Sequence, residues 1–403
     1  MSPRPICRSD DLRRLQAEGY TLDVIGGHLA VHDIPHVDGA GIVHRDGVLV
    51  MDLTLAGDAT TKPSDHTASF GPRIPCDHNG HELTTIINGR GDRTVGEVQV
   101  ACSMSMKPVP AGNYGDFYEK VTKYVAAIAG HATVLDSDTT AHVFRPVVTD
   151  GDDGPFRYLD TASARAGTDA LNDKLRGERV GIVGLGGTGE YVLDFVAKTH
   201  VEIIHIFDGD RFLTHNAFRA PGAPTLEQLR EAPYKVDHFA AIYGCMRDSI
   251  VTHPYAITDD NVEELLNLTF VFVCIDDPAA KAPIIDALIA HGIDFVDVGM
   301  GIELVDGMLT GIVRTTLVTS QKHDHAADRI STAAGGDGGE YRSNIQIAEL
   351  NARNASDAVI RWKKVRGVYA DLGGEHFTAF TITTNSVIND DSDDGPGAAL
   401  RCA

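Results

Sequence analysis

The sequence has no apolar run long enough to cross a lipid bilayer, which would take about 20 consecutive residues in a helix. Its first residues, Met1-Ser-Pro-Arg-Pro5, lack the apolar core of a secretory signal peptide. We therefore expect a cytoplasmic protein with no membrane partner.

Cysteine is scarce, and the cysteines are not paired along the chain. A zinc site built from two C-x-x-C motifs is excluded, because the sequence contains no such motif. Unpaired thiols are typical of a reducing compartment. The six cysteines are Cys7, Cys76, Cys102, Cys245, Cys274 and Cys402.

Positive charge is also in short supply. Lys and Arg total 35 against 57 Asp and Glu, which gives a formal net charge of −22. Proteins that bind nucleic acid need clustered Lys and Arg against the phosphates. We therefore expect no nucleic-acid partner, and the acidic surface is explained most simply by solubility.

A turn-rich acidic segment at 149–154 divides the chain. Upstream, residues 1–148 mix short strands with a helix near Tyr114–Ala129, which predicts a smaller α+β domain of unknown role. Downstream, residues 155–390 alternate strands and helices. This pattern is typical of an α/β fold with a Rossmann-like, doubly wound, mostly parallel sheet, here with a C-terminal antiparallel extension. Residues 391–403 are predicted to be a disordered tail.

Individual elements can be placed from their hydrophobic patterns. A polar segment at 319–341 predicts a mobile loop, and an amphipathic pattern predicts a helix over Asn344–Val365. The predicted strands are His28–Val31 and Gly47–Leu53 in the first domain, then Val180–Val183, Glu202–Phe207, Ser249–His253, Thr269–Ile275 and Phe295–Gly299, a hairpin of Ile302–Val305 and Met308–Arg314 turned at Asp306-Gly307, and Phe377–Thr383.

The most informative stretch is a glycine turn, Gly184-Leu-Gly186-Gly187-Thr-Gly189, between a strand and a helix. Glycines let the backbone approach a phosphate, and the helix N-terminus presents free N–H groups to it. The next strand ends at Asp208, where an acid accepts a hydrogen bond from a ribose hydroxyl. The stretch predicts a nucleotide-binding β-α-β unit, and by itself it is most common in NAD or FAD proteins.

The residues after Asp208 favour ATP. An enzyme that attacks the α-phosphate of ATP needs cations to neutralise the phosphates and a carboxylate to hold Mg²⁺. Suitable residues follow in order along the chain, namely Asp210, Asn216, Arg219, Lys235 and Asp276.

Together these motifs resemble the ThiF/MoeB/HesA family of ubiquitin-activating-enzyme-like adenylyltransferases. The family pattern runs G-x-G-G-x-G, D-x-D, N-x-x-R, a downstream Lys and a strand ending in D-C-T-D-N. The last element here reads V-C-I-D-D, so Asp276 takes the metal-binding position and Asp277 replaces the usual Asn. The resemblance covers roughly residues 155–390.

The resemblance implies ATP-dependent adenylation of a carboxylate with release of magnesium pyrophosphate. In this family the carboxylate is typically the C-terminal Gly-Gly of a ubiquitin-like protein, and the enzyme is a homodimer. The residues implied in cofactor binding are Gly184, Gly186, Gly187, Gly189, Asp208 and Asp210, and those implied in catalysis are Asn216, Arg219, Lys235, Asp276 and, donated across the dimer, Arg165.

Each catalytic assignment has a role and a structural alternative. Arg219 suits the β- and γ-phosphates, and Asn216 would orient a phosphate or the substrate carboxylate. Asp276 would bind Mg²⁺ or would instead cap the helix that begins at Pro278. Lys235 could be a solvated lysine at a helix start, and Arg165 a solvated surface arginine. Asp210 could support Asn216 or Arg219.

A thioester on the family's usual loop is excluded, because residues 275–401 contain no cysteine. The reaction therefore stops at the acyl-adenylate, or a thiol elsewhere takes the acyl group. Cys76, with His78 two residues on, is the first candidate for an acyl-accepting thiol. The alternative is a buried cysteine beside a loop histidine.

Other functions remain open. The same fold could serve an NAD-dependent oxidoreductase, or a non-catalytic nucleotide-binding scaffold that binds ATP without pyrophosphate exchange. A third alternative keeps the chemistry but changes the substrate to a small peptide or a modified tRNA base. The negative net charge disfavours tRNA.

Overall fold

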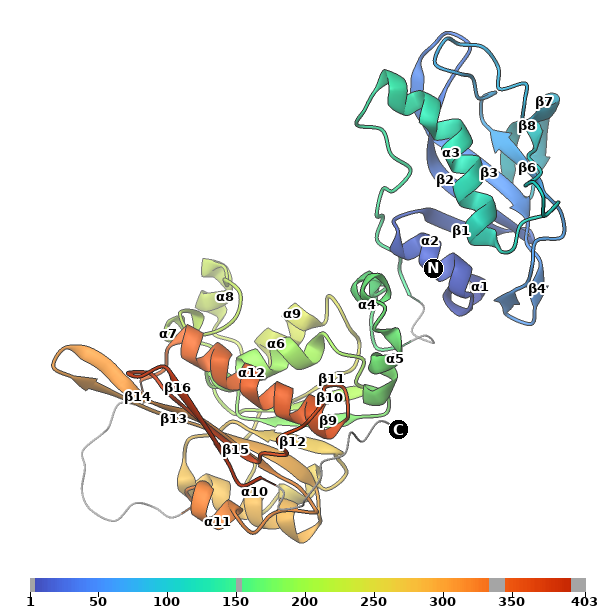
Figure 1. Ribbon diagram of the computed structural model, residues 1–403. Helices are drawn as coiled ribbons and strands as arrows, with labels where there is room; N and C mark the ends of the chain where they lie inside the picture. The colour runs from blue at the N-terminus through green and yellow to red at the C-terminus, as the bar shows by residue number, and fades with distance from the viewer. Residues whose placement is uncertain (1–3, 150–153, 333–344, 393–403) are drawn as a thin grey trace. The chain divides into compact units, whose positions relative to one another are not determined.

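Separate hydrophobic cores divide the chain into two units, one of Met1–Asp153 with Tyr158–Asp169 and one of Gly154–Arg157 with Ala170–Ala403. The computed structural model describes residues 4–149, 154–332 and 345–392 (Figure 1). Across these ranges, no helix combines the length and the apolar character needed to cross a membrane.

The first unit is a six-stranded antiparallel sheet covered by helix α3 (Phe117–Leu135). The sheet order is β1-β2-β3-β6-β8-β7, and Phe117, Tyr124 and Ile128 of α3 pack into its core. The predicted α+β class is confirmed. The other elements are α1 (Arg4–Arg8), α2 (Asp10–Ala17), β1 (Thr21–Ile25), β2 (His28–Val37), β3 (Val43–Asp52), β4 (Leu55–Ala56), β5 (Ala59–Thr60), β6 (Thr67–Gly71), β7 (Ile87–Val95), β8 (Val98–Ser105) and α4 (Thr161–Ala166).

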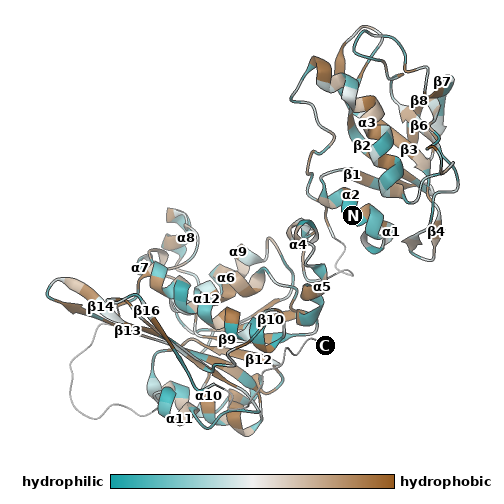
Figure 2. Ribbon diagram, viewed as in Figure 1, coloured by the Kyte–Doolittle hydropathy of each residue, from teal (hydrophilic) through white to brown (hydrophobic). Residues whose placement is uncertain are grey.

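Helix α3 begins three residues later than its sequence pattern suggested. The side chain of Asp116 accepts a hydrogen bond from the Glu119 N–H at 2.7 Å, and this N-cap sets the start of the helix. Figure 2 shows hydrophilic and hydrophobic segments alternating along α3, as expected for a helix with one buried face.

The second unit is built on an eight-stranded sheet with the order β11-β10-β9-β12-β13-β14-β15-β16. The strands from β11 to β13 are parallel, and those from β13 to β16 are antiparallel. The mostly parallel α/β sheet with an antiparallel extension is therefore confirmed. The strands are β9 (Arg179–Val183), β10 (Ile203–Phe207), β11 (Ile250–His253), β12 (Phe270–Val273), β13 (Asp294–Val305), β14 (Met308–Val318), β15 (Phe377–Thr381) and β16 (Ser386–Asp390).

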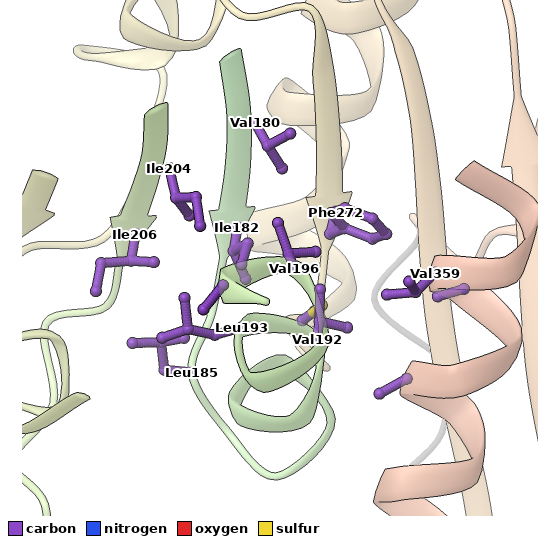
Figure 3. Close-up of a cluster of buried hydrophobic side chains, with 14 of the residues drawn as sticks. Val180, Ile182, Leu185, Val192, Leu193, Val196, Ile204, Ile206, Phe272 and Val359 are labelled. Carbon is purple, nitrogen blue, oxygen red and sulfur yellow. The ribbon is translucent and has the colours of Figure 1, made fainter. Parts of the chain in front are cut away.

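Helices cover both faces of this sheet. One face carries a core that includes Val180 and Ile182 of β9, together with side chains of α6 and α12, as Figure 3 shows. The opposite face carries a second core under α10, which includes Val183. The helices are α5 (Asp169–Asn172), η1 (Asp173–Leu175), α6 (Thr188–Ala197), α7 (Thr214–Ala217), α8 (Leu226–Glu231), α9 (Lys235–Tyr243), η2 (Val262–Leu265), α10 (Pro278–Ala290), α11 (Ala326–Arg329) and α12 (Ala348–Val365).

Several predicted boundaries differ from the structure. β13 and β14 are each one continuous strand, paired from Phe295 with Val318 to Val305 with Met308, so the predicted hairpin is the far end of a longer ladder. Strand β16 was not predicted, because its residues are all exposed and do not alternate between buried and exposed positions.

Two predictions of irregular structure are partly corrected. The predicted loop 319–341 contains α11, with His325 buried before it, while residues 333–341 lie outside the described residues. Asp391, the first residue of the predicted tail, accepts a hydrogen bond from Arg329 at 2.7 Å. Residues 393–403 lie outside the described residues.

The glycine turn shows why two of its glycines are not interchangeable. A methyl group added at Gly189 would collide with the backbone carbonyl oxygen of Gly184, whereas one added at Gly186 would meet nothing within 4 Å. Gly189 is therefore needed for the close contact of α6 with the start of the turn at Gly184, and Gly186 leaves an open space above the turn.

We predict that Gly189→Ala lowers the free energy of unfolding by about 1–3 kcal/mol, the usual cost of overpacking a tight contact. Gly186→Ala is the matched control and should change stability much less, because its added methyl group points into open space. Urea unfolding of both variants measures the difference. Equal losses in the two variants would contradict the assignment.

Candidate active site

The candidate site lies where β9, β10 and β12 end. β9 pairs with β10 on one side and with β12 on the other. The chain runs outward from β9 through β10 to β11 and then returns to β12, so the strand order reverses between β9 and β12. In open parallel sheets, ligands bind at such a switch point, beyond the carboxyl ends of the strands. The glycine turn follows β9 at this point.

Two more glycines of the turn have structural roles. Gly184 has φ +90°, and an added methyl group would lie 2.9 Å from the carbonyl oxygen of Cys274. Gly187 has φ +62°, and an added methyl group would collide with the side chains of Asn351 and Gln346. Both positions need glycine, because other residues rarely adopt positive φ.

Asp208 organises the turn. Its Oδ2 accepts the Leu185 N–H at 2.7 Å, its Oδ1 accepts the Asp210 N–H at 2.8 Å, and Lys235 Nζ lies 3.4 Å from Oδ2. A carboxylate has about four acceptor sites, so one remains for a ribose hydroxyl. The structure is thus compatible with the predicted ribose contact.

Lys235 is buried, with 5% of its surface exposed, so it is not a solvated lysine. It begins α9, and its Nζ lies 2.8 Å from Asp210 Oδ2 as well as close to Asp208. The polar partner that the structure shows for the Asp210 side chain is therefore Lys235, where the sequence suggested Asn216 or Arg219.

Asn216 and Arg219 follow on the short helix α7 and just after it. Asn216 is buried, and its Oδ1 accepts the Leu213 N–H at 2.9 Å. Among the described residues, Asn216 Nδ2 and Arg219 Nε are buried without a hydrogen-bond partner. Arg219 lines the pocket at the strand ends, whereas Asn216 is not among the residues that line it.

Asp276 and Asp277 divide the two roles that the sequence left open for Asp276. Asp277 is the N-cap of α10, and its Oδ1 accepts the Ala279 N–H at 2.9 Å. Asp276 is exposed and lines a pocket with Gly186 and Arg219. The pocket thus unites three predicted residues that are far apart in the sequence.

The same pocket is also lined by residues that sequence reasoning missed. They are Thr188, Lys281, Arg314, Gln346 and Asn354, together with the backbone of Gly299. Lys281 donates to the buried Asp297 and, at 3.3 Å, to the Val298 carbonyl oxygen. Burial raises the pKa of the Asp297 carboxyl. In the sequence, Asp297 is an acid within the apolar strand 295–298, a pattern that predicts a buried cationic or hydrogen-bonding partner.

Glu190 was also missed. It is fully buried at the start of α6, and neither of its carboxyl oxygens has a hydrogen-bond partner among the described residues. Burial raises the pKa of Glu190 to about 8, against the opposing influence of Lys235 and Arg219. In the sequence, its position directly after Gly189 places this acid next to the predicted nucleotide site.

Two predicted residues lie in the first unit. Arg165, at the end of α4, has its guanidinium carbon 5.2 Å from the ring centroid of Phe144. Its proposed action in a partner's site stays a prediction.

Cys76 is 2% exposed, and burial raises the pKa of its thiol, with a further contribution from Glu82. The neighbouring His78 is exposed and stacks on His131. These features favour the alternative of a buried cysteine beside a loop histidine, because a nucleophile needs an accessible thiolate. The acyl-accepting role of Cys76 remains a prediction that the geometry disfavours.

Family models match both halves of the chain. Residues 10–161 match a domain of unknown function (DUF6791), and residues 160–331 match the ThiF family. The chain therefore contains a ThiF family domain, as its motifs predicted. This match supports ATP-dependent adenylation of a carboxylate as the class of reaction.

Comparison with other proteins adds a loose likeness of fold. No curated protein matches the chain. The structure of E. coli MccB with succinimide is 14% identical, with a TM-score of 0.44 over 58% of this chain and 72% of that one. The structure of PaaA is 16% identical, with a TM-score of 0.41 over 55% of this chain and 75% of that one.

We predict that Lys281→Ala lowers the free energy of unfolding by about 3–5 kcal/mol, because it leaves the buried Asp297 carboxyl without its cation. Lys198→Ala is the control, since Lys198 is a half-exposed lysine paired with Asp194 at 2.7 Å and should contribute less than about 1 kcal/mol. Urea unfolding compares the two. Similar losses would show that the Lys281–Asp297 pair is not critical for stability.

Proposed function

We propose that this protein adenylates a carboxylate with ATP and releases pyrophosphate. One observation carries the proposal: Gly186, Arg219 and Asp276 line one pocket at the carboxyl ends of the parallel strands. An open backbone, a cation and a carboxylate are the groups that a magnesium-bound triphosphate requires. The ThiF family match supports the same reaction.

The residues present suit the steps of this reaction. The substrate carboxylate is already a nucleophile and needs no base, so the protein must hold two anions together and stabilise charge at the phosphorus centre. Arg219 and the Asn216 amide can donate to phosphate oxygens, and Asp208 can accept from the ribose. Lys235 can balance charge near the ribose, because it is already fixed by two carboxylates.

The site also suits Mg²⁺. This ion is usually bound by one or two carboxylates together with waters and phosphate oxygens, so Asp276 alone can supply the protein ligand. When bound, the ion would offset the negative charge of the departing pyrophosphate. Asp277 is occupied as a helix cap.

We propose the C-terminal glycine of a ubiquitin-like protein as the carboxylate, with a small peptide as the alternative. The pocket wall contains bare backbone at Gly186 and Gly299, which admits a narrow, extended tail. A methyl group added to Gly299 would collide with Arg314, so position 299 of the wall has no room for a residue larger than glycine. We further propose that the protein acts as a homodimer, with Arg165 reaching the partner's phosphates.

Asp276→Ala should abolish the tighter binding of MgATP relative to ATP in EDTA, because the carboxylate that holds the metal is lost. Titration calorimetry measures this difference without a carboxylate substrate. Exchange of radiolabelled pyrophosphate into ATP, with a synthetic peptide ending in Gly-Gly, then tests the chemistry.

The matched control is Asp277→Ala. It removes only the cap of α10, which should cost about 1 kcal/mol of stability and leave the effect of magnesium intact. Loss of the magnesium effect in Asp277→Ala, or its survival in Asp276→Ala, would refute the metal assignment. NAD binding in place of ATP would refute the proposed function.

Arg219→Ala should reduce pyrophosphate exchange by about 10²–10³-fold, the usual effect of removing one donor that stabilises developing anionic charge. Arg230→Ala on the neighbouring helix α8 is the control and should retain exchange. Circular dichroism would verify that both variants are folded. A loss below about tenfold in Arg219→Ala would remove Arg219 from the site.

A further inference from the structure

The buried carboxyl group of Glu190 is not explained by the reaction proposed above. It lies on the first turn of α6, directly after the glycines, and none of its surface is exposed. Neither oxygen has a hydrogen-bond partner among residues 4–149, 154–332 and 345–392. An ionised carboxylate in such a place is costly, because burial removes its hydration, and the nearby Lys235, Arg219 and Gly187 N–H offset that loss only in part.

The groups around Glu190 come from several elements, including α12, which packs against α6 and places Glu349 near the neighbouring Tyr191. Lys235 and Tyr243 lie on α9, Arg219 follows α7, and Asp208 ends β10. On α6 itself, Asp194 is already engaged, since it accepts the Tyr243 hydroxyl at 2.9 Å and pairs with Lys198. Tyr191 is uncharged, because burial raises its pKa above the ordinary value.

The balance of these charges decides whether an anion can bind. Lys235 is shared by two acids, Asp208 and Asp210, so Arg219 provides the remaining positive charge. If Glu190 is neutral, the two cations and the two aspartates cancel. If Glu190 is ionised, the two cations and three acids together carry a net negative charge. This charge lies beneath the turn where the phosphates of ATP would lie, and it opposes their binding.

We propose that Glu190 is a proton-holding group of the nucleotide site, neutral in the form that binds ATP, and that ATP affinity therefore depends on its protonation. This inference rests on the proposed ATP binding. Burial raises the pKa of Glu190 to about 8, so the neutral form predominates at pH 7 and becomes the minor form at pH 9. Glu190 acts through the charge that it places beside Arg219 and Lys235, so it is a positioning residue.

The test is the affinity of the full chain for MgATP between pH 7 and pH 9. If only the neutral form binds, wild-type affinity should fall about tenfold across this range, in proportion to the binding-competent fraction. Glu190→Gln keeps the shape and lacks the charge, so its affinity should stay flat and equal that of the wild type at pH 7. Glu231→Gln, an exposed residue of α8, is the control and should follow the wild type.

A second measurement needs only the wild-type protein. Above pH 8, MgATP binding should take up protons, which calorimetry detects as a difference in heat between buffers of different ionisation enthalpy. Absence of proton uptake overturns the inference even if Glu190→Gln fails to fold. Coinciding pH profiles of the wild type and Glu190→Gln overturn it too, with ATP binding itself left intact. Absence of MgATP binding at every pH overturns both this inference and the proposed function.

Thermal unfolding gives a readout that does not involve ATP. Because the folded state keeps the Glu190 proton where the unfolded chain has lost it, stability should decline as pH rises from about 4.5 to about 8. Glu190→Gln should lack this part of the decline and should melt above the wild type at pH 9. A melting temperature below that of the wild type at every pH, with an unchanged slope, would contradict a neutral Glu190 in the folded protein.

Discussion

The candidate site depends on the hydrogen bonds that the Asp208 carboxylate accepts. One of its oxygens accepts the N–H of Leu185, inside the glycine turn, and the other accepts the N–H of Asp210, beyond the end of β10. Lys235, at the start of α9, approaches the same group. One carboxylate therefore joins three segments, and it holds the glycine turn open over the strand ends. Because it is 9% exposed, these bonds form in a medium where they are stronger than in water.

Burial of charge is the second constraint. Several ionisable side chains near the pocket are buried. A buried charge lowers stability unless an opposite charge or a hydrogen bond stabilises it. Lys281, which lines the pocket, donates to one oxygen of the buried Asp297, whereas neither oxygen of Glu190 has such a partner among the described residues. Burial raises the pKa of both carboxyl groups, and the direct hydrogen bond from Lys281 opposes this effect at Asp297. Of the two buried acids, Asp297 therefore has a cation fixed against it, and Glu190 does not.

The sheet topology explains why these groups meet. β9 lies between β10 and β12, and each strand ends at the same edge. Asp208 follows β10, Asp276 follows β12 shortly after its last residue, and Gly186 follows β9. Packing on both faces fixes this edge, with Val180 and Ile182 directed into one core and Val183 into the other. Trp362 of α12, fully buried against Phe272, fixes the helix that supports Asn351 beside the turn.

The sequence by itself determined the class of fold, the ThiF family domain and the order of the candidate residues. Gly184, Asp208 and Asp276 could be placed because each follows an apolar strand, and strand and glycine patterns are local properties of the chain. Only the tertiary structure decided which acid caps α10, which acids hold Lys235, and that Lys281, Arg314 and Asn354 line the pocket. These facts depend on side chains brought together from distant segments, where packing and desolvation outweigh local pattern. The same holds for Glu190, because its burial arises only when α6 packs against α9 and α12.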